Sequence, residues 1–489
     1  MEKSEEKQGQ GCYEQRLLGE PVQSKISKLA ILTLMLGIFS LFFFVLAGIP
    51  AIVIGIISTL RIRRSAGKLR GKYIALAGMN ISIFFMVIFY LFWSIDAPPI
   101  PNDYTIADLR SAPAQYAESF EVLKTLIDED YDLSGFPTVE LTESDSKLIA
   151  EIRGIINTGS TSEISKTLNY YAEEIKQIWA DNETARDIIH RLNEFPEIVD
   201  LTEPSVDYMP MRLKDLVELT YLYDVYVHLQ TEQDDIHAVT LQLIELDSVF
   251  RKFSLNARPL FSKLVCYFCM TADILTANAI ANNARASQES IELLAGHFTP
   301  LTKEQLSLRN VVLFEYLLNR YNILDLLGQS IKGKTPLLKR NSTLRFYRNV
   351  CDNGINVLED IEDSANVGFL VWPSVYPCME PVSFQARKPL PLLYICYNPV
   401  GSLLLQTRFF SYESLLKRKT AIKIQDDLLQ IVLNKRLGKN VSLKARAYGD
   451  EYIVDVENGK IFSPGPDGKV ETKDDIMLRI DPEVLGWWN

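Results

Sequence analysis

The chain has 489 residues, which exceeds one ordinary hydrophobic core, so we expect a membrane unit with one large or two modest soluble domains. Hydrophobic residues make up 47% and charged residues 23%, proportions that exclude wholesale disorder. Acidic residues outnumber basic ones by 62 to 51, and outside residues 61–72 no basic stretch is long enough to follow a phosphate backbone, so we expect no nucleic-acid partner.

Residues 1–28 mix charged and polar side chains and are predicted to form a disordered cytoplasmic tail. A lipoprotein anchor at Cys12 is not expected, because residues 8–11 are polar where an apolar run would be needed. A cleavable signal peptide is not expected either, because its apolar core has about 7–15 residues and the apolar segments that follow are much longer.

Residues 29–94 are predicted to form a membrane unit that contains two uncharged segments, 29–60 and 73–93. The second has the length of a helix that spans ~30 Å of hydrocarbon. As a straight helix the first would measure ~48 Å, too long for one upright span. Because Gly48-Ile49-Pro50 interrupts it and proline lacks an amide hydrogen, we expect two helical pieces hinged there.

The orientation of this unit is predicted from the charges around it. Between the two segments lie six basic side chains and no acid: Arg61, Arg63, Arg64, Lys68, Arg70 and Lys72. Residues 96–109, in contrast, carry three aspartates and no base. The positive-inside rule therefore places the basic loop in the cytoplasm and residues 95–489 outside it.

Arg16, Lys25 and Lys28 precede the first segment, so basic residues stand on both of its sides. This favours a tight or re-entrant hairpin with both ends in the cytoplasm. A single kinked and tilted span, with the N-terminus outside, is the alternative.

Three motifs in this region are Gly48-Ile-Pro-Ala51, Ile62-Arg-Arg-Ser-Ala-Gly-Lys-Leu-Arg-Gly71 and Ala75-Leu-Ala-Gly78. On these motifs, residues 27–94 resemble a small bacterial membrane domain of unknown function. The resemblance implies a protein of the bacterial envelope, in the inner membrane, and brings no known catalytic residue.

Residues 95–104 are rich in proline and are predicted to form a stiff linker, followed by a helical domain over residues 105–445. Residues 213–229 form one helical run, and Asp234 and Asp235 are a plausible stop and N-cap before the next. That next run has a single apolar stripe, at steps of three and four: Ile236, Val239, Leu243, Leu246, Phe250 and Phe253.

Residues 302–305, Thr-Lys-Glu-Gln, fit a capping box that opens a helix including Leu306, Leu313 and Leu317. Helix pairs joined by short loops, with no fixed repeat period, favour a bundle or an irregular solenoid. Residues 372–399 contain six prolines and are predicted to be irregular, before a helix from about Tyr412 to Arg436. The Asn398-Pro-Val-Gly element before this helix resembles uncharacterised envelope proteins of planctomycete-type bacteria, which implies no activity.

The cysteines and histidines form no convincing catalytic constellation. Cys266 and Cys269 lie in an apolar helical run without a second cysteine pair, so core packing is favoured over a redox or zinc role. One disulfide among Cys351, Cys378 and Cys396 would be compatible with an oxidising compartment. The four histidines have no metal spacing and stand beside no nucleophile: His190, His228, His237 and His297. A binding role is therefore favoured over catalysis.

Residues 446–489 are predicted to form a β-hairpin followed by an acidic loop. The strand around Tyr452 to Val456 alternates apolar and polar side chains, and Asn458-Gly459 turns the chain into a second strand at residues 460–463. The loop that follows returns three carboxylates near one another, and calcium prefers such oxygen ligands. The alternative is a solvated turn.

The same loop resembles the C-terminal calcium loop of the major pseudopilin of type II secretion, through its Gly-Pro-Asp-Gly turn and later Asp-Asp-Ile. By that resemblance Asp467, Asp474 and Asp475 would be metal ligands, and calcium would have a structural role. The resemblance covers about 40 residues, and the pilin's single N-terminal helix and processing site are absent.

Three hypotheses about function follow. The first is a membrane-anchored, extracytoplasmic helical scaffold, whose partners are the lipid bilayer and envelope proteins or cell-wall material. The second, based on the terminal loop, is an accessory component of a secretion or pilus-like system. The third is a membrane-anchored hydrolase with a site assembled in the bundle.

Overall fold

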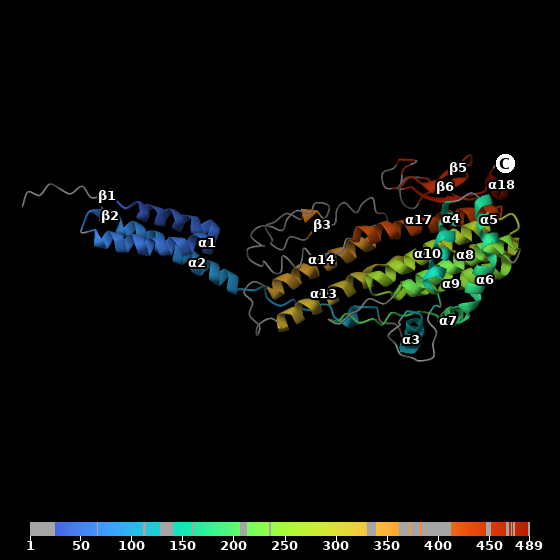
Figure 1. Ribbon diagram of the computed structural model, residues 1–489, viewed down its shortest axis with the longest axis horizontal. Coiled ribbons are helices and arrows are strands. Elements are labelled where there is room, and N and C mark those ends of the chain that lie inside the picture. Colours follow the sequence, from blue (N-terminus) through green and yellow to red (C-terminus); the bar gives the residue numbers. More distant parts are fainter. Residues whose placement is uncertain are drawn as a thin grey trace, which may run out of the picture. The chain divides into compact units, whose positions relative to one another are not determined.

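The computed structural model describes residues 25–65, 67–110, 114–127, 139, 141–158, 161–205, 213–233, 236–329, 339–360, 371–372, 382–383, 412–445, 451–465, 469–470, 472 and 475–487. The chain divides into two compact units: among the described residues, the membrane unit comprises 25–98 and Lys339, and the helical unit comprises the others from Pro99 onward. Both units consist mainly of helices, and a small sheet lies near the C-terminus (Figure 1). The predicted fold class is confirmed.

The membrane unit contains two helices, α1 (Lys28–Arg64) and α2 (Lys72–Ser94). Strand β1 (Lys25–Ile26) pairs in parallel with β2 (Leu69–Arg70), so the residues before α1 lie beside those after it. A straight helix of this length would hold its two ends ~55 Å apart. The segment therefore folds back on itself, as the favoured hairpin interpretation predicts.

The position of the reversal follows from pairs of residues that face each other across α1. A methyl group added at Gly48 would lie 3.8 Å from the Ser40 side chain, and one at Gly55 would lie 2.9 Å from that of Thr33. The reversal therefore lies before Gly48, and the hinge predicted at Gly48-Ile49-Pro50 is wrong in position. Pro50 instead lies near the start of the part of α1 that follows the reversal, where a missing amide hydrogen costs little.

Small side chains let the backbones of this unit approach closely, as is usual for helices in lipid. A methyl group added at Gly37 would lie 2.5 Å from the carbonyl oxygen of Gly78. Large apolar side chains face outward instead, and Phe43, Leu46 and Phe84 are more than half exposed. Two stretches are long and apolar enough to cross a membrane, Leu46–Arg64 and Lys72–Leu91. These are the features of a membrane protein.

The helical unit is built around α10 (Leu260–Ala281), which contacts α8 (Lys214–Glu232), α9 (Ile236–Asn256) and α17 (Tyr412–Arg436). Length and composition would also let α10 span a membrane, but 67% of it is buried inside the unit. Because neighbours cover it on several sides, α10 is the core of a helical bundle.

Among the described residues, the other helices before α8 are η2 (Ile106–Asp108), η3 (Ala114–Tyr116), α3 (Ala117–Ile127), α4 (Glu143–Thr158), α5 (Thr161–Tyr170), α6 (Ala172–Asp181) and α7 (Glu183–Glu194). The helices described between α10 and α17 are α11 (Gln288–His297), α12 (Lys303–Leu306), α13 (Arg309–Gln329) and α14 (Arg340–Asp360). Two short strands, β3 (Val371–Trp372) and β4 (Val382–Ser383), pair antiparallel within the proline-rich region.

Several predicted elements are confirmed. All six residues of the apolar stripe on α9 are buried, and the predicted helix from Tyr412 to Arg436 is α17. The capping box of Thr302 and Gln305 is present, but it opens only α12, which ends at Leu306. The predicted single helix is therefore wrong, because the chain turns before α13 begins at Arg309. Asp234 and Asp235 lie outside the described residues.

The C-terminal sheet has the order β5-β6-β7 and is antiparallel, with strands β5 (Ile453–Asp455), β6 (Lys460–Ser463) and β7 (Ile476–Arg479). The predicted hairpin is its first pair, and Gly459 takes the positive φ of 59° that the turn requires. Strand β7 was not predicted. The short helix α18 (Pro482–Leu485) follows, capped by the carboxylate of Asp481.

Candidate functional site

Of the three predicted calcium ligands, only Asp475 is described; Asp467 and Asp474 lie outside the described residues. The Asp475 carboxylate accepts a hydrogen bond of 3.1 Å from the Thr472 hydroxyl. Strands β6 and β7 pair Ser463 with Ile476, so both ends of the loop at 464–475 lie side by side. Within the described part of the chain, no cluster of three or more His, Cys, Asp or Glu is placed to hold a metal.

The cysteines on α10 are packing residues, as predicted. Cys266 and Cys269 are free and completely buried, and burial raises the pKa of the Cys266 thiol to about 12. Cys351, on α14, is also free and buried. Cys378 and Cys396 lie outside the described residues, so the disulfide alternative for them stays a prediction.

Three histidines pair with carboxylates, and His237 lies on the surface. The pairs, with their N–O distances, are His190 with Glu245 at 2.5 Å, His228 with Asp224 at 3.3 Å, and His297 with Asp247 at 2.7 Å. The first and third pairs join neighbouring helices, whereas His228 and Asp224 are one turn apart on α8. None of these pairs forms a triad with a nucleophile among the described residues.

A polar site of the helical unit surrounds its first residues, 99–110, which we call the entry segment. Arginines from the bundle donate to its backbone carbonyls, and these bonds measure 3.0–3.5 Å. They run from Arg345 to Pro99, from Arg348 to Asn102, from Arg309 to Asp108 and from Arg258 to Arg110. Because charged donors make the stronger hydrogen bonds, the segment is held along its whole length.

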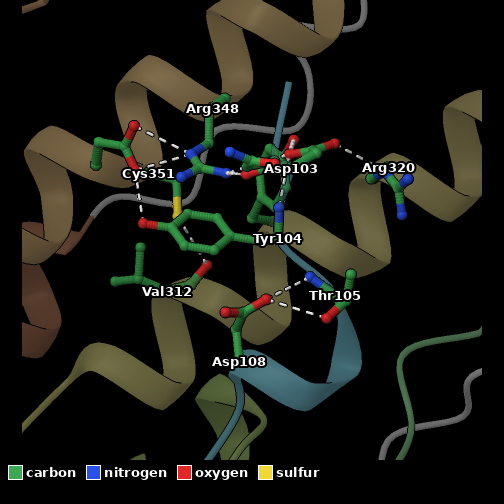
Figure 2. Close-up of polar contacts among 11 residues, drawn as sticks. Asp103, Tyr104, Thr105, Asp108, Val312, Arg320, Arg348 and Cys351 are labelled. Atoms are coloured by element: carbon green, nitrogen blue, oxygen red, sulfur yellow. Dashed lines mark hydrogen bonds and ion pairs between the residues drawn. The ribbon is translucent and has the colours of Figure 1, made fainter. Parts of the chain in front are cut away.

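Asp103 is the centre of this site (Figure 2). Its carboxylate accepts a hydrogen bond of 2.6 Å from the Tyr316 hydroxyl and forms ion pairs with Arg320 at 3.0 Å and Arg348 at 3.3 Å. The three partners come from α13 and α14. One aspartate of the entry segment therefore connects both helices of this pair.

Tyr104 makes the second set of contacts. Its hydroxyl donates to Asp352 at 2.7 Å, and the Arg348 guanidinium lies 3.3 Å from the centre of its ring. Burial and the Asp352 carboxylate raise the pKa of Tyr104 to about 12, so its hydroxyl stays a donor at neutral pH. The ring also meets Tyr316 edge to face, at 5.8 Å between centroids.

The segment then turns into η2 through a local cap. The backbone amide and the hydroxyl of Thr105 both donate to Asp108, at 2.7 and 3.1 Å. The hydrogen bond from the Thr105 backbone amide is the main cause that lowers the pKa of Asp108. The carboxylate is therefore charged and holds the turn. Figure 2 shows this cap next to the Asp103 and Tyr104 contacts.

Sequence reasoning placed Asp103 and Tyr104 in a linker and so missed their role. The pattern Thr105-x-x-Asp108 was an available signal, because a threonine followed three residues later by an acid is typical of a helix start. The arginine and tyrosine partners had no such signal. They lie more than 200 residues further along the chain.

A second buried network connects α9 with α17 and with the loop after α11. Arg251 donates to Asp247 at 2.5 Å, to Asp426 at 3.0 Å and to the Thr299 carbonyl at 2.9 Å. The Asp426 carboxylate also accepts a bond from the Leu301 amide. Both carboxylates and the guanidinium are buried, so the network joins distant parts of the bundle.

The two units therefore define a membrane protein with a large helical domain. Residues 29–92 match a domain of unknown function (DUF4190). No curated protein and no solved structure matches the chain. The predicted resemblance to a small membrane domain of unknown function is confirmed over this region, and the resemblances of the Asn398-Pro-Val-Gly element and of the C-terminal loop stay predictions.

Proposed function

We propose that the protein is a membrane-anchored scaffold of the bacterial inner membrane that presents a rigid helical domain outside the cytoplasm. Its partners would be envelope proteins or cell-wall material. The observation that carries the proposal is the seating of the entry segment on α13 and α14 by Asp103, Tyr104 and Arg348. A protein that only needed to stay near a membrane could use a free linker.

The charges around the membrane unit support the proposed orientation. Its basic residues lie between and before the apolar helices, whereas residues 96–109 carry only acids. Lys and Arg are retained on the cytoplasmic side during insertion. The unit would then be multi-pass, with α2 crossing outward and residues 95–489 following it.

The orientation can be tested with alkaline phosphatase, which is active only outside the cytoplasm. Fused at Asn489, the enzyme should be active in cells, and fused in the basic loop after Ser65 it should be inactive. A fluorescent protein that matures only in the cytoplasm should give the reverse pattern. Phosphatase activity at the loop and not at Asn489 would contradict the proposal.

Binding can be tested by cross-linking in intact cells. Photo-reactive residues at exposed positions of the bundle, such as Tyr170 and Leu241, should capture a defined envelope partner. The same residue placed at buried Leu243 is the matched control, and it should capture nothing. Equal products from both kinds of position would reflect unfolding and would count against a scaffold.

We also propose that the loop at 464–475 binds calcium through Asp467, Asp474 and Asp475, with a stabilising role. The pairing of Ser463 with Ile476 supports this, because it closes the loop and so limits the space that its oxygens occupy. An accessory role in secretion would depend on this loop alone. The hydrolase hypothesis stays a prediction.

A further inference from the structure

We infer that the membrane unit carries a binding surface for the headgroups of anionic phospholipids. The inference rests on the proposed membrane insertion and adds a ligand class to it. The surface, which we call the basic collar, consists of eight side chains that the fold gathers at one end of the unit: Lys25, Lys28, Arg61, Arg63, Arg64, Lys68, Arg70 and Lys72.

Six collar residues lie within residues 61–72, and the fold adds Lys25 and Lys28 to them. The backbone amide of Lys25 donates to the Lys68 carbonyl at 3.2 Å, and that of Ser27 donates to the Arg70 carbonyl at 3.0 Å. These bonds bring Lys25, which precedes α1, and Lys28, its first residue, to the loop that follows α1. Because only backbone atoms take part, this pairing leaves the basic side chains exposed.

The turn that carries the loop is fixed in the same way. The Ser65 hydroxyl oxygen accepts a bond of 3.1 Å from the Leu69 amide. Gly71 adopts a φ of 112°, and a methyl group there would lie 3.3 Å from the Ala30 side chain. This residue must therefore be small and conformationally permissive for the loop to pack on the start of α1.

All eight basic side chains are exposed, and residues 25–95 contain no aspartate or glutamate. Within residues 25–95 the collar therefore has no carboxylate to balance its charge. Like charges held this close repel one another unless anions lie between them. A dense set of phosphates, such as an anionic leaflet offers, has the complementary charge.

The neighbours of the collar indicate lipid and not a free anion. Ile26 is 55% exposed and Tyr73 is 85% exposed, and both stand next to collar bases in the sequence. Tyrosine is enriched where hydrocarbon meets headgroups, and the apolar stretch Lys72–Leu91 begins at the same point. A phosphate bound beside these exposed apolar side chains would belong to a phospholipid.

The inference can be tested with the full-length protein purified in a neutral detergent. Native mass spectrometry would count bound phosphatidylglycerol and phosphatidylcholine, each added at equal concentration. We expect a preference for phosphatidylglycerol that weakens with salt. The triple variant Lys25→Gln, Lys68→Gln and Arg70→Gln should reduce the apparent affinity on the order of a hundredfold, since each base contributes roughly fivefold.

The matched control neutralises three exposed lysines of the helical unit, Lys166→Gln, Lys303→Gln and Lys439→Gln, and should keep the wild-type preference. Equal losses in both variants, or no loss in the collar variant, would overturn the inference. So would displacement of the lipid by the same concentration of inorganic phosphate. Carbonate extraction of membranes separates the two proposals: a protein that washes off refutes insertion, whereas an inserted protein without lipid preference refutes only the collar.

Discussion

The side chains of Arg348 and Tyr104 contact each other and converge on the same carboxylate. The guanidinium lies 3.3 Å from the centre of the Tyr104 ring, and both residues hydrogen-bond to Asp352, at 2.9 and 2.7 Å. The three contacts close a triangle between the entry segment and α14. Removing one member therefore deletes its two contacts and weakens the third, because each residue positions its neighbours.

The entry segment should be released by substitution of Arg348. Tyr104→Phe removes one hydrogen bond and should lower the free energy of unfolding by about 1 kcal/mol. Arg348→Ala removes one of the three partners of Asp103 as well as the ion pair with Asp352, and should cost about 2–4 kcal/mol. Denaturant unfolding measures both values, and limited proteolysis within residues 99–110 should become faster.

The control for these variants is Arg191→Ala. Arg191 pairs with Glu118 at 2.7 Å, but both side chains are more than half exposed, so the change should stay within about 0.5 kcal/mol. An Arg348→Ala protein as stable and as protease-resistant as Arg191→Ala would show that the contacts of Arg348 do not hold the entry segment.

The contrast between α9 and the entry segment shows which features of the structure could be predicted from the sequence. The stripe from Ile236 to Phe253 was predictable, because a helix repeats every 3.6 residues and the spacing of its apolar residues indicates its buried face. The partner of Asp103, Tyr316, lies 213 residues away, and no local pattern encodes that contact. Strand β7 was missed for a related reason, since its pairing with β6 decides its conformation.

The buried Arg251 network should be essential for the stability of the bundle. Arg251→Met leaves Asp426 without its buried counter-charge and should cost about 3–5 kcal/mol. Adding Asp426→Asn to this variant removes the uncompensated charge and should restore part of the loss. Chemical denaturation of the single and double variants measures the difference, and a double variant less stable than Arg251→Met would contradict this account.

Stability should depend on pH through Glu315. Burial raises the pKa of this carboxyl from 4.5 to about 7, and a bond from the Leu260 amide only partly offsets the effect. The folded protein therefore holds the proton more tightly than the unfolded chain. The stability that this proton provides is complete below pH 4.5 and is lost as the pH rises through 7.

Glu315→Gln keeps an amide oxygen that can accept from Leu260 but cannot ionise. Relative to the wild type it should be more stable at pH 8, by roughly 1–3 kcal/mol, and nearly unchanged at pH 4.5. Melting temperatures across this range test the effect, with the exposed Glu304→Gln as control. A difference between Glu315→Gln and wild type that is the same at every pH would contradict it.

The thiols of Cys266 and Cys269 should be inert in the folded protein. Both side chains are completely buried, and burial raises their pKa values, so neither access nor thiolate is available. Maleimide labelling followed by peptide mapping should modify them only after denaturation. Rapid modification of either residue under native conditions would favour the redox role over core packing.

Calcium removal should loosen the C-terminal sheet if the loop at 464–475 binds the ion. At a calcium concentration a hundred times the dissociation constant, binding contributes about 2.7 kcal/mol to the folded state. A chelator should therefore speed hydrogen exchange at β6 and β7. Asp467→Asn combined with Asp474→Asn should remove this response, whereas Glu457→Gln, an exposed acid of the neighbouring turn, should keep it. The same exchange rates with and without chelator in the wild-type protein would leave the solvated turn as the explanation of the loop.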